Sequence, residues 1–182
     1  MEKALFKRTL IKLSKETLFI LLTVASAVIL PQIFHGVGVL LGVGGKLGQI
    51  LLPMYLPVLI IGFYRGIAPG AVAGFFAPLI SFALTGMPQE SLLPYITVEL
   101  IATGALAGVF AKIKIPATLR VLSVQALAKA LRLIIFAIAL YSANGAITAT
   151  ALFAGIVSSI PGILLQLILV SYLIIKKEKS NA

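Results

Sequence analysis

Residues 67 to 86 read I-A-P-G-A-V-A-G-F-F-A-P-L-I-S-F-A-L-T-G. This stretch carries no charge and is long enough to cross a bilayer as one helix. Small residues recur every fourth position in it or just before it: Gly66, Gly70 and Gly74, and separately Ala73 and Ala77. Small residues four apart share one face of a helix and let another backbone approach closely. The stretch therefore predicts a transmembrane helix with a close-packing face, turned either to the rest of the chain or to a partner.

The composition places the rest of the chain in a membrane as well. Of its 182 residues, 60% are hydrophobic and 11% are charged, whereas a soluble domain has roughly 25% charged residues. We predict an all-α integral membrane protein, a bundle of six transmembrane helices without a separate soluble domain. The spans are expected at about residues 17–34, 50–64, 67–86, 92–111, 118–141 and 147–175.

The net charge of +10 indicates topology rather than nucleic-acid binding, because most of the cations lie at the ends of apolar segments. Six spans place both termini on one side, and the positive-inside rule makes that side cytoplasmic. The basic positions there are the N-terminal segment, Arg65, Lys112, Lys114, Arg120, Lys176, Lys177 and Lys179. Residues 1–16 are expected to form an amphipathic helix on the cytoplasmic surface. A signal peptide cleaved near residues 25–27 is the alternative, but the apolar run continues to Phe34, which favours an uncleaved first span.

Residues 36–48 form the longest glycine-rich segment. They contain Gly36, Gly38, Gly42, Gly44, Gly45 and Gly48 together with Lys46. The segment is too apolar for a simple solvated loop and too rich in glycine for a stable helix. A mobile extracellular loop that gates a binding site fits this pattern, and so does a plain linker with an interfacial anchor.

Three ionisable residues fall inside predicted spans and away from the span ends, where each costs several kcal/mol unless it is paired or hydrated. Glu99 lies in the fourth span, and Lys129 and Arg132 lie in the fifth. Gln125, Lys129 and Arg132 share one helix face because they follow i, i+4, i+7 spacing. If Glu99 pairs with Arg132, Lys129 is left uncompensated and suits an anionic substrate group. A fifth span beginning after Arg132 is the alternative, but residues 133–141 are too few to cross.

The residues that enzymes and metal sites need are scarce. The chain has no aspartate, no cysteine and one histidine, His35. It has no nucleophile motif or phosphate-binding loop of the usual spacing. We therefore expect neither catalysis nor a metal or other cofactor.

Three segments in order carry a family resemblance. They are P-Q-I-F-H-G-V-G (31–38), G-Q-I-L-L-P-M-Y-L-P-V-L-I-I-G-F (48–63) and G-A-V-A-G-F-F-A-P-L-I-S-F-A-L-T-G-M-P (70–88). With the six-span plan they resemble the substrate-binding S-components of energy-coupling factor transporters. The resemblance implies a small six-helix bundle that binds a vitamin or its precursor near the extracellular side, gated by the loop after the first helix. It also implies association with a transmembrane scaffold subunit and two cytoplasmic ATPases, in the plasma membrane of a prokaryote.

The resemblance and the polar residues together define the predicted site. The expected substrate-binding residues are Gln49, Tyr55, Glu99, Gln125, Lys129, Arg132 and Asn144. The expected gating residues are Gly36, Gly38, Gly42, Gly44, Gly45 and Lys46. The expected lipid-exposed scaffold-docking face comprises Thr23, Ala27, Gly66, Gly70, Ala73, Gly74 and Ala77. The sequence departs from the family pattern at Thr23, where the first helix lacks a clean Ala-x-x-x-Ala motif, and at Tyr55, where related sequences often have histidine.

Two other function classes stay open at this point. A proton-coupled secondary transporter would use Glu99 as its proton carrier and would need no ATPase partner. A membrane assembly protein would bind no small molecule at all. The ionisable residues inside the spans favour the two transport readings over the third.

Overall fold

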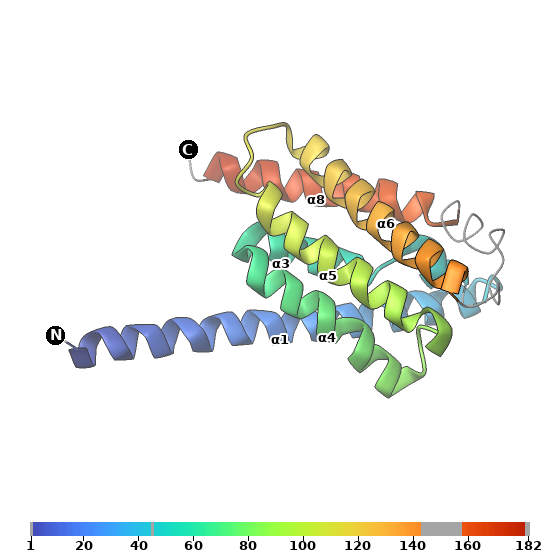
Figure 1. Ribbon diagram of the computed structural model, residues 1–182, viewed down its shortest axis with the longest axis horizontal. Helices are drawn as coiled ribbons and strands as arrows, with labels where there is room; N and C mark the ends of the chain where they lie inside the picture. Colours follow the sequence, from blue (N-terminus) through green and yellow to red (C-terminus); the bar gives the residue numbers. More distant parts are fainter. Residues whose placement is uncertain (1, 45, 143–157, 181–182) are drawn as a thin grey trace.

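The computed structural model describes residues 2–44, 46–142 and 158–180, and all the regular elements in these ranges are helical. The α-helices are α1 (Glu2–Leu40), α2 (Lys46–Leu51), α3 (Tyr55–Arg65), α4 (Ile67–Thr85), α5 (Leu93–Phe110), α6 (Ala117–Ser142) and α8 (Ile160–Ser180). A short 3₁₀ helix, η1 (Glu90–Leu92), leads into α5. The long helices lie roughly side by side, with the start of α1 and the end of α8 toward the same end of the molecule (Figure 1).

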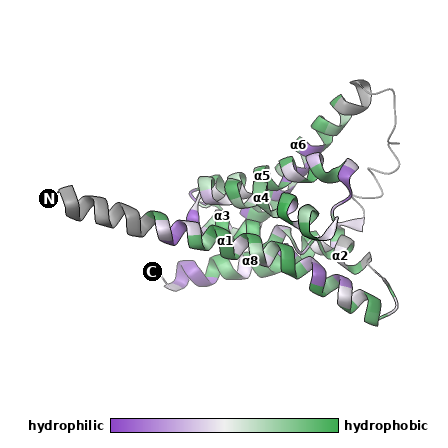
Figure 2. Ribbon diagram, turned by 90° about the horizontal axis from the view of Figure 1, so that it is seen from below, coloured by the Kyte–Doolittle hydropathy of each residue, from purple (hydrophilic) through white to green (hydrophobic). Residues whose placement is uncertain are grey.

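Five of the described helices are long and apolar enough to cross a membrane. They are α1, α4, α5 with η1, α6 and α8. Large apolar side chains face outward on these helices, for example Leu22, Phe76, Val109, Ile134 and Ile168, and apolar colouring runs along the helix bodies (Figure 2). Lipid covers such surfaces in a membrane protein, whereas a soluble monomer rarely exposes them. The prediction of an all-α, multi-pass membrane protein is therefore confirmed.

The count of six spans stays a prediction. The sixth predicted span, 147–175, lies partly outside the described residues, and α8 continues beyond it to Ser180. The second predicted span, 50–64, is divided into α2 and α3. With 11 residues, α3 extends only about 16 Å, roughly half the hydrocarbon thickness.

The first helix is longer than the sequence predicts. α1 runs without interruption from Glu2 to Leu40, so no break in the helix marks the expected boundary between a surface helix and a span near residue 16, and that boundary stays a prediction. The expected loop from residue 36 is wrong at its start, because Gly36 and Gly38 belong to α1. Gly38 packs against the carbonyl of Gly44, too close for a side chain. This contact offsets part of the helix-propensity cost of glycine, about 1 kcal/mol.

The connection between α1 and α2 is correspondingly short. Gly42 and Gly44 adopt positive φ angles of 72° and 62°, which glycine does at no steric cost. The gating prediction for Gly36 and Gly38 is thus corrected, because both are helical, while Gly42 and Gly44 do lie in a turn. Gly45 and the side chain of Lys46 lie outside the described residues.

A break at residues 52–54 separates α2 from α3. Pro53 has no N–H to continue a helix, and it disfavours a helical conformation for Leu52 before it. Leu52 takes a φ of 47°, which is rare for a residue with a side chain. The Leu52 carbonyl accepts a hydrogen bond from Nε2 of Gln166 in α8, at 3.0 Å. The backbone N–H of Tyr55 also donates to this carbonyl, at 3.1 Å, so the buried amide of Gln166 is a second donor that ties α8 to the break.

The small-residue face of α4 packs within the chain, against α5. Gly70 contacts the backbone of Gly104, and Gly74 contacts that of Leu100. A second row of small residues on α5, including Gly104 and Gly108, makes this approach possible, because a Cβ on Gly108 would meet the backbone of Ile67. Residues 67–85 therefore form a helix, as predicted, and the small-residue face of this helix packs against α5.

This packing corrects the predicted docking face. Five of its seven residues are buried inside the described bundle and are not exposed to lipid: Ala27, Gly70, Ala73, Gly74 and Ala77. Ala73 packs with Val24 and Ile61, and Ala77 packs with Ala27 and Tyr55. The other two, Thr23 and Gly66, are partly exposed. Gly66 joins α3 to α4 with a φ of 101°, a conformation that favours glycine, so its role is in the turn between the two helices.

Candidate functional site

The candidate site is built on Glu99, a carboxylate on α5 that is 1% exposed. Tyr55 donates its hydroxyl to Oε2 of Glu99 at 2.8 Å. Lys129 donates from Nζ to Oε1 at 3.0 Å, and Arg132 donates from Nη1 to Oε2 at 2.8 Å. One carboxylate is thus shared by a phenol and two cations from two other helices.

The order of the helices brings these four side chains together. α5 packs against both α3 and α6, and it passes between them in the bundle (Figure 1). Tyr55 is the first residue of α3. Lys129 and Arg132 lie in the middle of α6, which runs unbroken from Ala117 to Ser142. Their spacing of three residues places both on the side of α6 that faces α5.

The contacts settle how the three charges pair. Glu99 pairs with Arg132 across adjacent helices, the arrangement that the sequence left open. Lys129 was expected to be uncompensated, but it binds the other oxygen of the same carboxylate. This is possible because a carboxylate has two oxygens and both cations project from one helix face. Two cations against one anion still leave a charge of +1 in the cluster.

The two cations are not fully buried. Their side chains are 16% exposed for Lys129 and 21% for Arg132, against 1% for Glu99. The cluster therefore has a closed side, formed by Glu99 and Tyr55, and a side where the cations remain accessible. The Lys129 ammonium lies 5.6 Å from the centre of the Tyr55 ring, a distance at which ring and cation attract each other.

Gln125 extends the polar face of α6 by one turn. It is 6% exposed, and its Nε2 has no hydrogen-bond partner among the described residues. A buried donor without a partner costs about 1–3 kcal/mol. An amide in this position has an unused donor for an acceptor group on a bound molecule or for a water.

Phe136, which the sequence did not single out, is a buried aromatic residue on the same helix as Lys129 and Arg132. It is 1% exposed, and its ring centre lies 5.0 Å from that of Tyr95. Phe136 follows Arg132 by four residues, so the i+4 spacing that linked Gln125 to Lys129 was the signal that pointed to it. This aromatic pair closes the same face of α6 one turn beyond Arg132.

Two predicted binding residues lie outside what the structure describes. Asn144 falls in the segment 143–157, and the side chain of Gln49 is likewise outside the described part, although its backbone belongs to α2. The structure therefore brings together Tyr55, Glu99, Lys129 and Arg132, with Gln125 on the same face of α6.

The fold and these contacts define a class: a helical membrane protein with a positively charged, hydrogen-bonded cluster between its helices. In comparisons with known proteins, no family model, no curated protein and no solved structure matches the chain. The function is therefore argued from the site.

Proposed function

We propose that this protein is the substrate-binding subunit of an energy-coupling factor importer. Its substrate would be a water-soluble vitamin or vitamin precursor that carries an anionic group. Delivery would depend on association with a transmembrane scaffold and two cytoplasmic ATPases, in the plasma membrane of a prokaryote. The observation that carries the proposal is that Lys129 and Arg132 share the single carboxylate of Glu99.

The charge of this cluster favours an anionic ligand. An unbalanced cation between apolar helices is costly, and an anionic group brought by a substrate offsets that cost. Arg132 uses Nη1 for Glu99, and its planar guanidinium has further donors suited to a carboxylate. Lys129 has three donors on one nitrogen. A substrate carboxylate would thus bind on the accessible side of the two cations, opposite Glu99.

The roles of the neighbouring residues follow from their contacts. Glu99 and Tyr55 orient the cations from behind, because both are buried and hydrogen-bonded to each other. Gln125 would supply a neutral hydrogen bond to another part of the substrate. With the small-residue face of α4 covered by α5, the scaffold would contact other, outward-facing apolar surfaces of the bundle.

A proton-coupled transporter remains the second candidate, because Glu99 is a buried carboxylate in a span. Its contacts argue against this role. A proton on Glu99 would occupy an oxygen that now accepts charge-assisted hydrogen bonds, which are about twice as strong as neutral ones. A carrier must release and regain its proton in every cycle, and this carboxylate is held by two cations.

The binding test uses purified full-length protein. Mass spectrometry of small molecules released on denaturation identifies a ligand, and titration calorimetry with nicotinate, pantothenate and lipoate measures affinity directly. We expect Lys129→Gln and Arg132→Gln to weaken binding at least tenfold, since a lost charge-assisted bond is worth about 1.5–3 kcal/mol. Lys114→Gln, outside the cluster, is the matched control and should bind like the wild type.

Vesicles that contain only this chain separate the candidates. The proposed subunit binds its vitamin but does not accumulate it without the scaffold and ATPases. Accumulation that an uncoupler abolishes would establish the proton-coupled transporter instead. Full-strength binding in both cation variants would remove the cluster from the substrate site, and absence of any bound small molecule would favour the assembly protein.

A further inference from the structure

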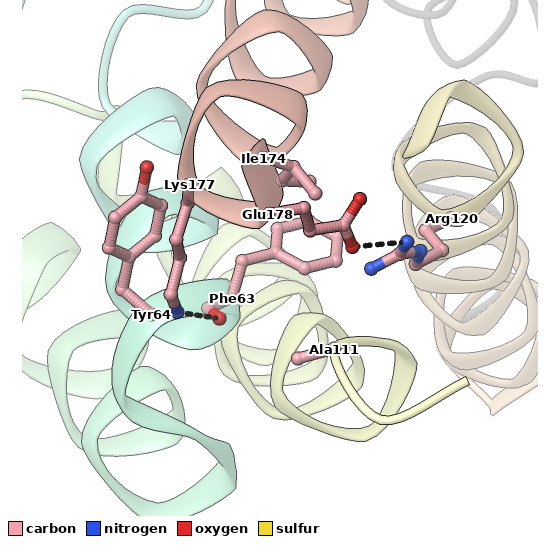
Figure 3. Close-up of a pocket in the computed structure, with 7 residues that line it drawn as sticks. All are labelled: Phe63, Tyr64, Ala111, Arg120, Ile174, Lys177 and Glu178. Atoms are coloured by element: carbon pink, nitrogen blue, oxygen red, sulfur yellow. Dashed lines mark hydrogen bonds and ion pairs between the residues drawn. The ribbon is translucent and has the colours of Figure 1, made fainter. Parts of the chain in front are cut away.

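A cavity of about 130 Å³ lies at the end of the bundle where α3, α5 and α8 finish and α6 begins. Its lining comprises Phe63, Tyr64, Ala111, Arg120, Ile174, Lys177 and Glu178 (Figure 3). Ala111 follows Glu99 by 12 residues at the end of α5, roughly 18 Å at about 1.5 Å per residue, and no residue of the Glu99 cluster lines the cavity, so the two sites are separate. The cavity contains two cations and one carboxylate.

Arg120 is held rigidly in this cavity. It is 8% exposed. Its Nε donates to the carbonyl of Ile115 at 2.8 Å, and its Nη2 donates to Oε1 of Glu178 at 2.6 Å. Nη1 makes no hydrogen bond to the described residues. Two bonds therefore fix the plane of the guanidinium while one terminal nitrogen keeps its donors for another acceptor.

Lys177 provides a second cation with donors to spare. Its Nζ lies 4.3 Å from the centre of the Tyr64 ring. Its hydrogen bond to the carbonyl of Phe63 is long, 3.5 Å, and therefore weak. Figure 3 shows Lys177 and Arg120 approaching the cavity from different helices, with Glu178 turned toward Arg120. The Tyr64 ring therefore holds the Lys177 ammonium in place, while the N–H donors of Lys177 remain available for another acceptor.

The surroundings favour an anion that is attached to an apolar body. Two cations against Glu178 leave a local charge of +1, and Glu178 is half exposed. Further lysines follow α5 and end α8: Lys112, Lys114, Lys176 and Lys179. Phe63, Ala111 and Ile174 supply apolar walls next to the lipid-facing surface of the bundle. A free anion would use the cations but gain nothing from these walls.

We propose that this cavity binds the phosphate of an anionic phospholipid headgroup. Arg120 Nη1 and Lys177 Nζ would contact the phosphate oxygens, and the glycerol would lie against Ala111 and Ile174. Basic pockets between transmembrane helices are suited to such headgroups, because arginine and lysine there meet phosphate at the membrane surface. The site does not depend on the vitamin-binding proposal.

The test measures lipid binding to the full-length, delipidated protein in detergent by native mass spectrometry. Phosphatidylglycerol and phosphatidylcholine are added separately at equal concentration, and inorganic phosphate is added in a third series. We expect phosphatidylglycerol to bind several-fold more tightly than phosphatidylcholine. Lys177→Gln should weaken phosphatidylglycerol binding about fivefold, as expected for one cation near a lipid phosphate.

Two neighbouring residues supply opposite controls. Lys176→Gln removes an equal charge from an exposed position one residue away and should change binding less than twofold. Glu178→Gln removes the carboxylate that competes for Arg120, so it should strengthen binding about two- to fivefold. An increase cannot result from a misfolded variant, which keeps the proposal falsifiable.

Each remaining outcome overturns a named part of the proposal. Equal losses in the two lysine variants would show that the general basic field attracts the lipid and that the cavity does not. Weaker or unchanged binding in Glu178→Gln would exclude Arg120 as a phosphate ligand. Saturable binding of inorganic phosphate, without preference between the two lipids, would make the ligand a free anion.

Discussion

Replacing Glu99 by glutamine removes the one negative charge that Lys129 and Arg132 share. The substitution keeps the shape of the side chain but changes its chemistry. One amide oxygen then stands in place of two carboxylate oxygens, and the amide NH₂ group faces a donor. Tyr55, Lys129 and Arg132 all contact the carboxylate, so at least one of them loses its acceptor.

The size of the effect follows from burial. Breaking a buried ion pair by removing one partner costs about 3–5 kcal/mol, because the other charge stays buried. The cations here are 16% and 21% exposed, so water replaces part of what they lose. We therefore expect Glu99→Gln to lower the free energy of unfolding by about 3 kcal/mol, the lower end of this range.

Unfolding in mixed micelles with increasing dodecyl sulfate measures this value. The chain has no tryptophan, so far-ultraviolet circular dichroism is the suitable signal. Glu90→Gln is the control, since Glu90 is exposed on η1 and its substitution should change stability by about 0.5 kcal/mol or less. Adding Lys129→Gln to Glu99→Gln should recover part of the loss, because one uncompensated charge disappears. A cost below about 1 kcal/mol for Glu99→Gln would mean that water already solvates both cations, and the reasoning would be refuted.

Two further substitutions test the packing around the site. Tyr55→Phe removes the hydroxyl that donates to Glu99 and should cost about 1–3 kcal/mol in the same titration, and a neutral result would mean that Glu99 does not need this donor. Gly70→Ala should destabilise the protein by about 2 kcal/mol or more, because the added Cβ meets the backbone of Gly104, which has no flexible side chain to yield. Gly36→Ala, also in a helix but with open space around it, should instead stabilise by up to about 1 kcal/mol; the same sign for both glycines would contradict the packing argument.

The sequence predicts most of the long helices and singles out the charged residues of the central cluster, for identifiable reasons. Arg65 and Gly66 precede the apolar stretch 67–86, and Gly86 ends it. The predicted span 67–86 therefore agrees with α4 to within one residue. Glu99 and Arg132 stand out because charges inside apolar stretches need partners, and few partners exist in this chain. Both the ends of the span and the positions of the charged residues can be read directly from composition and spacing.

The partner of the small-residue face could not be predicted in the same way. Periodicity shows that Gly70 and Gly74 share a face, but it does not show which helix covers that face. The signal that was available is a second row of small residues four apart, Gly104 and Gly108 in the fourth span. Two such rows in consecutive spans are complementary, and the connection through η1 is short enough to bring them together.

The extent of α1 could not be predicted from the sequence because helix propensity does not include tertiary contacts. Gly36 and Gly38 lower the stability of an isolated helix, yet both belong to α1, where Gly38 packs closely against the backbone of Gly44. The shared use of Glu99 by both cations was missed for a similar reason. A simple count of charges assigns one cation to each anion. A carboxylate has two oxygens, so Glu99 can accept hydrogen bonds from Lys129 and Arg132 together.

The hydrogen bond between Leu52 and Gln166 has a consequence for the order in which the chain is assembled. Its two residues are 114 positions apart, so the ribosome completes most of the protein before the donor exists. Before that, the Leu52 carbonyl has the backbone N–H of Tyr55 as a donor, at 3.1 Å, and its second lone pair can be satisfied by water but not by lipid. We therefore expect the segment between α2 and α3 to stay in contact with water during synthesis and to become dry only when α8 inserts. Truncated nascent chains that end before α8 should keep this segment accessible to a water-soluble label after Leu52 is replaced by cysteine, and the full-length chain should protect it.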